Sequence, residues 1–273
     1  MAGHIHYQVD PAGTGLARVT LEHTGKFNAI SRSMWRELRV VFEAIAREPG
    51  LRCVWVQGAG GHFCAGGDIA EYPDFRFDAQ ALHDFHENDV WGGLQAMLDC
   101  NLPILAQIEG NCMGAGLEIA SCCDLRFASE TARFGAPIAR LGFPMAPKEA
   151  ALVASAVGIT TARAMMLAAT VLEAPALLNS GFLTSVHAAD ALQGHCQNVA
   201  NTVLSLSPMA AQVHKSTFRA LNSPLAQVNS ALLAINNIAN DENLDPLAPY
   251  TYAGHAEHRE GIAAFLAKRK PQF

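Results

Sequence analysis

The sequence predicts an α/β protein with a helical appendix. In the first two thirds of the chain, short apolar or alternating segments end at glycine-rich turns, and longer segments with apolar residues at helical spacing lie between them. In the last third, helical patterns dominate. Strands and helices that alternate in this way indicate the α/β class.

The first elements are a strand hairpin, a helix and a buried strand. Residues 4–10 and 17–23 alternate like two strands, and a Pro-Ala-Gly-Thr-Gly turn joins them. Ser31 is a suitable N-cap for a helix with an apolar stripe, which stops before Pro49. The apolar run over 52–58 then indicates a buried strand.

The middle of the chain continues this alternation. A glycine-rich stretch over 59–67 precedes a polar helix over 78–99 and a strand over 104–109. A helix starts near Gly114, and a short strand is expected over 124–128.

The tail of the chain is predicted to be mainly helical. It opens at Pro208, since proline suits the first helical turn. It includes the apolar segment 222–240, which we expect to be buried between helices or subunits, and a final helix near 257–268. We therefore divide the chain into a core of residues 1–204 and a helical region of residues 205–273.

Composition excludes several classes of function. Half of the 273 residues are hydrophobic and 16% are charged, which is typical of a globular protein. The net charge of −6 and the lack of a basic stripe argue against nucleic-acid binding. The first residues lack the features of a signal peptide, and charged residues or prolines interrupt every apolar run. A cytoplasmic protein without a membrane partner is expected.

The seven cysteines point to neither disulfides nor a metal site. Their number is odd, most lie in apolar segments, and no two Cys-x-x-Cys pairs complete a zinc site. We expect them to be reduced and mostly buried, and we expect no metal.

Two glycine-rich segments could be interpreted as known motifs. Residues 58–61 begin like a dinucleotide fingerprint, but Phe63 occupies the place of the third glycine. Residues 110–114 match the Gly-x-nucleophile-x-Gly pattern of a hydrolase elbow, with Cys112 as the nucleophile. Its partners would be Asp190 with a downstream histidine, and this Cys112-dependent α/β-hydrolase stays open as an alternative.

A third interpretation uses both glycine-rich segments, 62–69 and 110–128, together. Each presents backbone N–H groups with little side chain to obstruct approach. Two such amides that converge on one carbonyl oxygen form an oxyanion hole, and a helix start adds its positive end. Glu118 lies three residues after Ala115, so both face the same side of the expected helix. A carboxylate beside an anion hole suits proton transfer next to a thioester carbonyl.

These two segments resemble the matching segments of the crotonase superfamily, the enoyl-CoA hydratases and isomerases. Residues 62–69 read His-Phe-Cys-Ala-Gly-Gly-Asp-Ile, and residues 110–118 read Gly-Asn-Cys-Met-Gly-Ala-Gly-Leu-Glu. The similarity keeps the family's order and spacing over almost the whole chain, through the further segments 26–30, 123–128, 134–137, 140–144 and 259–271.

The resemblance implies a fold and a set of site residues. The family folds as a spiral of ββα units followed by helices that build trimers, often paired into hexamers. The amides of Ala65 and Ala115 would form the oxyanion hole for an acyl-CoA thioester, with coenzyme A part of the substrate and no separate cofactor. The residues that would line the CoA end of the pocket or contact CoA are Cys64, Gly67, Asp68, Ile69, Phe265 and Lys268.

The catalytic carboxylates depart from the family pattern. Glu118 matches the first of the two glutamates that hydratases use, but Ile138 stands where the second is expected. This departure predicts slow hydration and favours decarboxylase-like or lyase-like activity, in which enolate stabilisation carries most of the work. Glu149 is a possible auxiliary group, whereas His83 and His86 are expected on a solvated helix face.

The sequence therefore predicts an acyl-CoA enzyme of the enoyl-CoA hydratase/isomerase family. It would stabilise a thioester enolate in a two-amide oxyanion hole, with Glu118 transferring the proton. Because the second glutamate is missing, a CoA-binding homologue without turnover also stays open.

Overall fold

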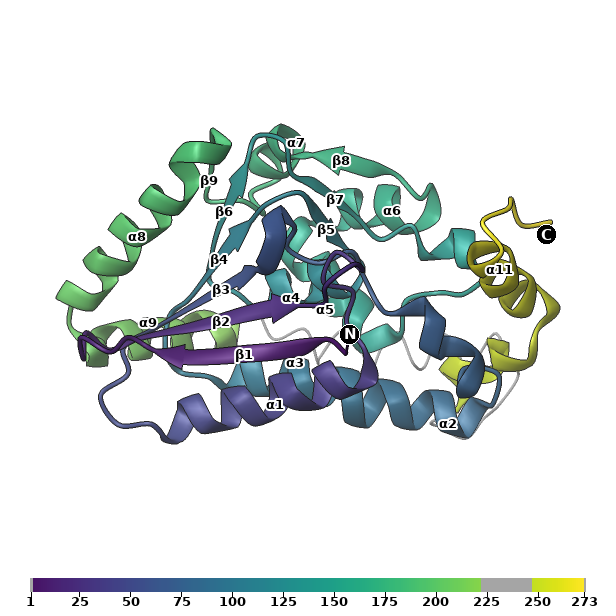
Figure 1. Cartoon of the computed structure of the whole chain (residues 1–273), viewed down its shortest axis with the longest axis horizontal. Helices are drawn as coiled ribbons and strands as arrows, with labels where there is room; N and C mark the ends of the chain where they lie inside the picture. Colours follow the sequence, from purple (N-terminus) through teal and green to yellow (C-terminus); the bar gives the residue numbers. More distant parts are fainter. Residues whose placement is uncertain (1, 222–246, 273) are drawn as a thin grey trace.

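A six-stranded sheet is the centre of the structure, which is a computed structural model that describes residues 2–221 and 247–272 (Figure 1). Its strand order is β1-β2-β3-β4-β6-β9. β1 (His4–Val9) pairs with β2 (Leu16–Glu22) in antiparallel fashion, which confirms the predicted hairpin. All later neighbours are parallel: β3 (Cys53–Gly58), β4 (Ile104–Ile108), β6 (Leu125–Ser129) and β9 (Ser185–His187).

A second, three-stranded sheet lies beside the first. It consists of β5 (Asn111–Met113), β7 (Arg133–Gly135) and β8 (Val171–Glu173). Consecutive strands alternate between the sheets, because β4 and β6 belong to the larger sheet and β5 and β7 to the smaller one. Helix α4 (Ala115–Ser121) follows β5, and α5 (Pro147–Val157) comes after β7. Two strands and a helix thus form the repeating unit of a spiral.

The helix that follows the hairpin begins where the sequence predicts. α1 (Arg32–Arg47) starts after Ser31, whose Oγ accepts a hydrogen bond from the Met34 amide at 3.2 Å. It buries one face against α3 and ends before Pro49. On the other side of the sheet, α8 (Ala189–Ser205) covers β3, β4 and β6 and closes a second, smaller core around Trp55.

The helix predicted over 78–99 is one helical run with an internal irregularity. α2 (Ala79–Asp84) passes into a π-helical turn (Phe85–Val90) and then into α3 (Trp91–Asp99). π-Helical turns inside α-helices are frequent at functional sites. The run is less solvated than predicted, because Leu82, Leu94 and other side chains of one face are buried in the main core.

The remaining helices cover the smaller sheet and the C-terminal region. They are α6 (Ile159–Leu167), α7 (Ala174–Asn179), α9 (Pro208–Leu221) and α11 (Ala256–Leu266), with 3-10 turns over Ile69–Asp74 (η2), Ile138–Leu141 (η4) and Ala248–Gly254 (η5). The predicted segment 222–240 lies outside the described residues. No helix in the part of the chain that the structure describes is long and apolar enough to cross a membrane.

Two glycines let α11 pack tightly against η4. A Cβ atom on Gly261 would lie 2.2 Å from the carbonyl carbon of Leu141. A Cβ atom on Gly142, whose φ is +74°, would lie 2.1 Å from the Glu257 carbonyl oxygen. Both distances are far shorter than a van der Waals contact, so only glycine permits this approach. The contact brings the C-terminal helix onto a loop that follows β7.

Candidate active site

The two glycine-rich segments lie side by side in the structure. The Cys64 amide donates to the Asn111 carbonyl at 2.8 Å, and the Met113 amide donates back to the Cys64 carbonyl at 2.9 Å. This short parallel bridge extends the smaller sheet by one segment. Immediately beyond it, a Cβ atom on Gly114 would lie 3.7 Å from the Gly66 Cα. The stretch that follows Cys64 therefore passes directly beside the start of α4.

The hydrogen bonds of residues 64–68 identify a candidate oxyanion donor that differs from the predicted one, Ala65. The Ala65 amide donates to the Phe27 carbonyl at 2.9 Å, so it is not available to a substrate. The Asp68 amide donates to the Ile30 carbonyl at 2.8 Å. Among residues 64–68, all of which the structure describes, only the amide of Gly67 has no acceptor. The prediction of Ala65 is corrected, and Gly67 becomes the candidate donor.

The engagement of Ala65 depends on an unusual turn at Phe27 and Asn28. Both residues have positive φ angles, 48° and 60°, which are uncommon for residues other than glycine. The Asn28 side chain holds this turn, because its Oδ1 accepts from the His23 amide at 3.0 Å and its Nδ2 donates to the His62 carbonyl at 2.7 Å. The turn aims the Phe27 carbonyl at the Ala65 amide.

The second candidate donor is the Ala115 amide. Ala115 is the first residue of α4, where an amide has no partner within the helix and the helix dipole is positive. Gly116 allows α4 to start against Cys64, since a Cβ atom there would lie 2.7 Å from the Cys64 carbonyl oxygen. The amides of Gly67 and Ala115 therefore belong to two segments in contact.

Glu118 lies in the first turn of α4 and is buried, with 9% of its surface exposed. Burial, and secondly the charge of Glu149, raise the pKa of the Glu118 carboxyl to about 8, while Arg76 opposes the shift. The carboxyl group therefore holds its proton near neutral pH. A carboxyl with a pKa near the working pH is suited to acid–base catalysis.

A second carboxylate, Glu149, reaches the same region from the first turn of α5. It is 2% exposed, and α5 packs against α4. Its Oε1 lies 2.9 Å from Nδ1 of His86, whose side chain is only 11% exposed. The expectation of a solvated His86 is therefore wrong, because Glu149, Arg76 and Tyr250 surround its ring. Burial lowers the pKa of His86, so the imidazole is neutral.

Sequence reasoning missed Arg76 and Tyr72, which complete this buried polar cluster. The Arg76 guanidinium carbon lies 4.4 Å above the Tyr72 ring. A Cβ atom on Gly67 would lie 2.1 Å from the Tyr72 hydroxyl oxygen, so Tyr72 links Arg76 to the candidate oxyanion hole. The Tyr252 hydroxyl accepts from Arg76 Nη2 at 3.3 Å. The only available signal was an arginine set among aromatic residues in 72–77.

The other predicted site residues are placed as follows. Ile138 is half-buried and packs against the main core. Asp68 is buried, pairs with Lys26 at 2.5 Å and caps η2, which contains Ile69. Phe265 and Lys268 are exposed at the end of the C-terminal helix. That helix packs on η2 and η4, so it approaches the loop after Asp68.

All seven cysteines are free and buried, as predicted. Cys112 is fully buried in β5, and burial raises the pKa of its thiol far above the ordinary value. A reactive cysteine needs the opposite environment, which favours the thiolate. Within residues 2–221 and 247–272, no group of three or more histidine, cysteine, aspartate or glutamate side chains could hold a metal ion.

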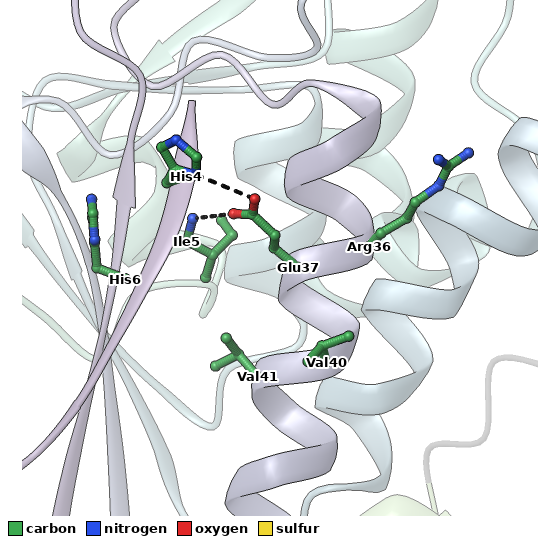
Figure 2. A pocket seen from close by; sticks show the side chains of 7 residues that line it. All are labelled: His4, Ile5, His6, Arg36, Glu37, Val40 and Val41. Atoms are coloured by element: carbon green, nitrogen blue, oxygen red, sulfur yellow. Dashed lines mark hydrogen bonds and ion pairs between the residues drawn. The ribbon is translucent and has the colours of Figure 1, made fainter. Parts of the chain in front are cut away.

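A surface groove elsewhere contains none of these residues. It lies between β1 and α1, has a volume of about 440 Å³, and is lined by His4, Ile5, His6, Arg36, Glu37, Val40 and Val41 (Figure 2). Glu37 crosses it and accepts from the Ile5 amide at 2.8 Å. Glu37 thereby gives the edge strand β1 a hydrogen-bond partner.

The fold and the paired glycine segments define a crotonase-type protein. A family model described as enoyl-CoA hydratase/isomerase matches residues 12–273. The chain belongs to the enoyl-CoA hydratase/isomerase family, and it is an enzyme acting on acyl-CoA by that membership.

Individual relatives agree with this assignment. The chain is 30% identical over 256 residues to the 2,3-dehydroadipyl-CoA hydratase of Escherichia coli. It is 28% identical over 258 residues to a probable enoyl-CoA hydratase of Mycobacterium leprae. Both alignments cover 93% of this chain and 93% of the relative. Among solved structures, an enoyl-CoA hydratase/carnithine racemase from Magnetospirillum magneticum matches with a TM-score of 0.77 and 28% identity over 98% of this chain and 94% of that chain. A methylmalonyl-CoA decarboxylase shares the fold at 21% identity and a TM-score of 0.78, covering 98% of this chain and 97% of that one.

Proposed function

We propose that this protein hydrates an enoyl-CoA thioester reversibly, with Glu118 and Glu149 as its two catalytic carboxyl groups. The observation that carries the proposal is that both carboxyl groups are buried in the first turns of two helices, α4 and α5, that pack against each other. Glu149 would do the work of the glutamate that Ile138 replaces, from a position eleven residues later in the chain. The relatives named as hydratases support the same reaction.

The proposed reaction assigns one proton to each carboxyl group. Glu149, which accepts a hydrogen bond from His86, takes a proton from water as the water oxygen bonds to the β carbon of the substrate. The double-bond electrons move to the thioester oxygen, and the Gly67 and Ala115 amides stabilise the resulting enolate. Glu118, protonated near neutral pH, then donates its proton to the α carbon.

The CoA end of the substrate would lie along the segment from Cys64 to Ile69. Phe265 and Lys268 are exposed at the end of α11 and just after it, and α11 packs against η2, so they are the proposed C-terminal contacts for CoA. Asp68 is already paired with Lys26, so its proposed role is to hold this loop rather than to bind the ligand.

We also propose that the protein forms a trimer or a pair of trimers. α9 exposes Met209, Val213 and Phe218, each more than half exposed, and a solvated helix does not require such side chains. Sedimentation at micromolar concentration should give three or six copies of the chain. A stable monomer would contradict this assembly.

A second candidate function is cleavage or decarboxylation of an acyl-CoA, which the apolar Ile138 favours. Both reactions need the anion hole and one proton donor but no activated water. The deciding experiment incubates the protein with a panel of 2-enoyl-CoA and malonyl-type CoA thioesters and identifies the products by mass spectrometry. Formation of 3-hydroxyacyl-CoA supports hydration. Release of CO2 without hydration supports the second candidate, and tight binding with no product supports a CoA-binding protein without turnover.

A further inference from the structure

Arg76 is a buried cation in an aromatic environment. It follows η2, and only 1% of its surface is exposed. Its guanidinium carbon lies 4.1 Å from the centre of the Phe143 ring and 4.4 Å from that of Tyr72. Arginine is almost never fully buried unless it is paired. The aromatic faces stabilise the charge, but a cation–π contact offsets only part of the cost of removing it from water.

The hydrogen bonds of Arg76 leave donors unused. Nη1 lies 3.4 Å from Nε2 of His86, and Nη2 donates to the Tyr252 hydroxyl at 3.3 Å. The buried Nε–H has no acceptor among residues 2–221 and 247–272. Within the described residues no carboxylate oxygen lies within 4.0 Å of the guanidinium, although Asp and Glu neutralise other arginines such as Arg32 in this way. Both partners of Arg76 are uncharged groups.

The contacts of His86 explain why the protein itself does not neutralise Arg76. An arginine can only donate, so Nε2 of His86 accepts from it, and Nδ1 of the neutral ring carries the proton that Glu149 accepts. The imidazole ring thus bonds to both groups and lies between the Glu149 carboxylate and the guanidinium. This carboxylate is bonded to His86 and not to Arg76.

Arg76 is linked through Tyr72 to the candidate oxyanion hole. Tyr72 lies between Arg76 and Gly67, whose amide is a candidate oxyanion donor. Arg76 also acts on Glu118 electrostatically. In the proposed mode of binding, the thioester oxygen lies at Gly67 and the α carbon near Glu118, and the acyl chain would extend toward the guanidinium.

We propose that Arg76 binds a carboxylate at the far end of the acyl chain, so that the substrates are CoA monothioesters of dicarboxylic acids. This inference rests on the proposed acyl-CoA function. A carboxylate fits the planar fork of a guanidinium and would use the Nε–H and a free Nη–H together. Such a bond stabilises the carboxylate in the bound substrate, which favours a reaction that retains it over one that releases it as CO2.

Binding of saturated thioesters tests this inference without requiring turnover. Adipyl-CoA and hexanoyl-CoA have acyl chains of equal carbon number, as do glutaryl-CoA and pentanoyl-CoA, and succinyl-CoA and butanoyl-CoA. Isothermal titration should show that the wild type binds at least one dicarboxylic thioester roughly 10- to 100-fold more tightly than its matched partner. Arg76→Met should abolish that preference, while its affinity for hexanoyl-CoA should stay within about twofold of the wild-type value. Arg76→Lys should keep part of the preference because the charge remains.

The matched control is Arg259→Met. Arg259 also stacks on an aromatic ring, that of Phe77 at 4.4 Å, but it is exposed. The Arg259→Met variant should keep the wild-type preference for dicarboxylic thioesters. Equal binding of all three matched pairs by the wild type overturns the inference, as does a preference that survives Arg76→Met in a folded variant. Should Arg76→Met fail to fold, the wild-type and Arg76→Lys titrations decide alone. Failure of the proposed hydration is a separate result, because it appears as 2-enoyl-CoA thioesters that bind but are not converted to 3-hydroxyacyl-CoA.

Discussion

Nδ1 of His86 lies 2.9 Å from Oε1 of Glu149, which is buried, and the His86 side chain is largely shielded from solvent. His86 comes from a π-helical turn and Glu149 from the first turn of α5, so two elements more than sixty residues apart fix one hydrogen bond. The bond holds the Glu149 carboxylate in place on a helix that packs against α4. It is the geometric reason for treating Glu149 as a catalytic group rather than as a helix-terminal charge.

Glu149→Gln should lower kcat for hydration by about 10²- to 10⁴-fold, because it removes the proposed proton acceptor while keeping the shape of the side chain. KM should change little. Glu87→Gln is the matched control, since Glu87 lies next to His86 but pairs with Lys148 outside the proposed chemistry. The measurement is steady-state kinetics of both variants on any enoyl-CoA that the wild type accepts. Equal, small effects of both substitutions would remove Glu149 from the mechanism.

Glu118 should make both stability and activity depend on pH. Its pKa is raised from 4.5 to about 8, mainly by burial. Between these values the folded protein holds a proton that the unfolded chain releases, so the free energy of unfolding falls as pH rises through this window. Glu118→Gln should flatten that slope in urea unfolding, whereas the exposed Glu130→Gln should not.

The same titration predicts the activity profile. Because Glu118 acts as the acid in hydration, kcat/KM should fall as the pH rises above about 8. Glu118→Gln should be nearly inactive at every pH. A wild-type profile that rises through pH 8 would assign Glu118 the role of base instead.

The Ala115 amide can be tested with little damage to the fold. Ala115 is the first residue of α4, and proline is tolerated at this position because its missing N–H has no helical partner. Ala115→Pro should therefore remove one oxyanion donor and lower kcat by about 10²- to 10³-fold. Ala115→Gly keeps the N–H and should retain activity. Comparable activity of the two variants, both folded by circular dichroism, would exclude this amide from the oxyanion hole.

The order of elements could be predicted from the sequence because it depends on local patterns. The hairpin, the Ser31 cap and the start of α4 all follow from alternation, capping chemistry and glycine placement within a few residues. The wrong choice of Ala65 has a tertiary cause. Spacing identifies the segment, but which amide stays free depends on the Phe27 carbonyl, which a positive-φ turn aims at Ala65.

The environment of Arg76 could not be predicted for a similar reason. Its aromatic and hydroxyl partners include Phe143 and Tyr252, which are distant in sequence and meet only when the C-terminal segment packs over η2. Helical periodicity likewise placed His86 on a solvated face. The π-helical turn and the covering ring of Tyr250 bury it.

Cys112→Ser should keep most of the activity. The thiol is fully buried within β5, and its raised pKa leaves it protonated. If Cys112 were the nucleophile, this substitution would instead lower the activity of the protein by orders of magnitude. The measurement is the rate of thioester hydrolysis, detected as the appearance of free CoA. Hydrolysis in the wild type that disappears in Cys112→Ser would restore the hydrolase interpretation.

Ile138→Glu tests whether Glu149 has taken over from the missing glutamate. In the Glu149→Gln background, a carboxylate at position 138 should recover part of the lost hydration, because Glu118 and the amides of Gly67 and Ala115 are unchanged. In the wild-type background it should give no gain, since a third buried carboxyl group would raise the pKa values of its neighbours further. Ile138→Gln in the Glu149→Gln background is the control, because it has a similar shape without a charge. Recovery by glutamine as large as that by glutamate, or a large gain from Ile138→Glu in the wild type, would show that Glu149 does not replace the second carboxylate.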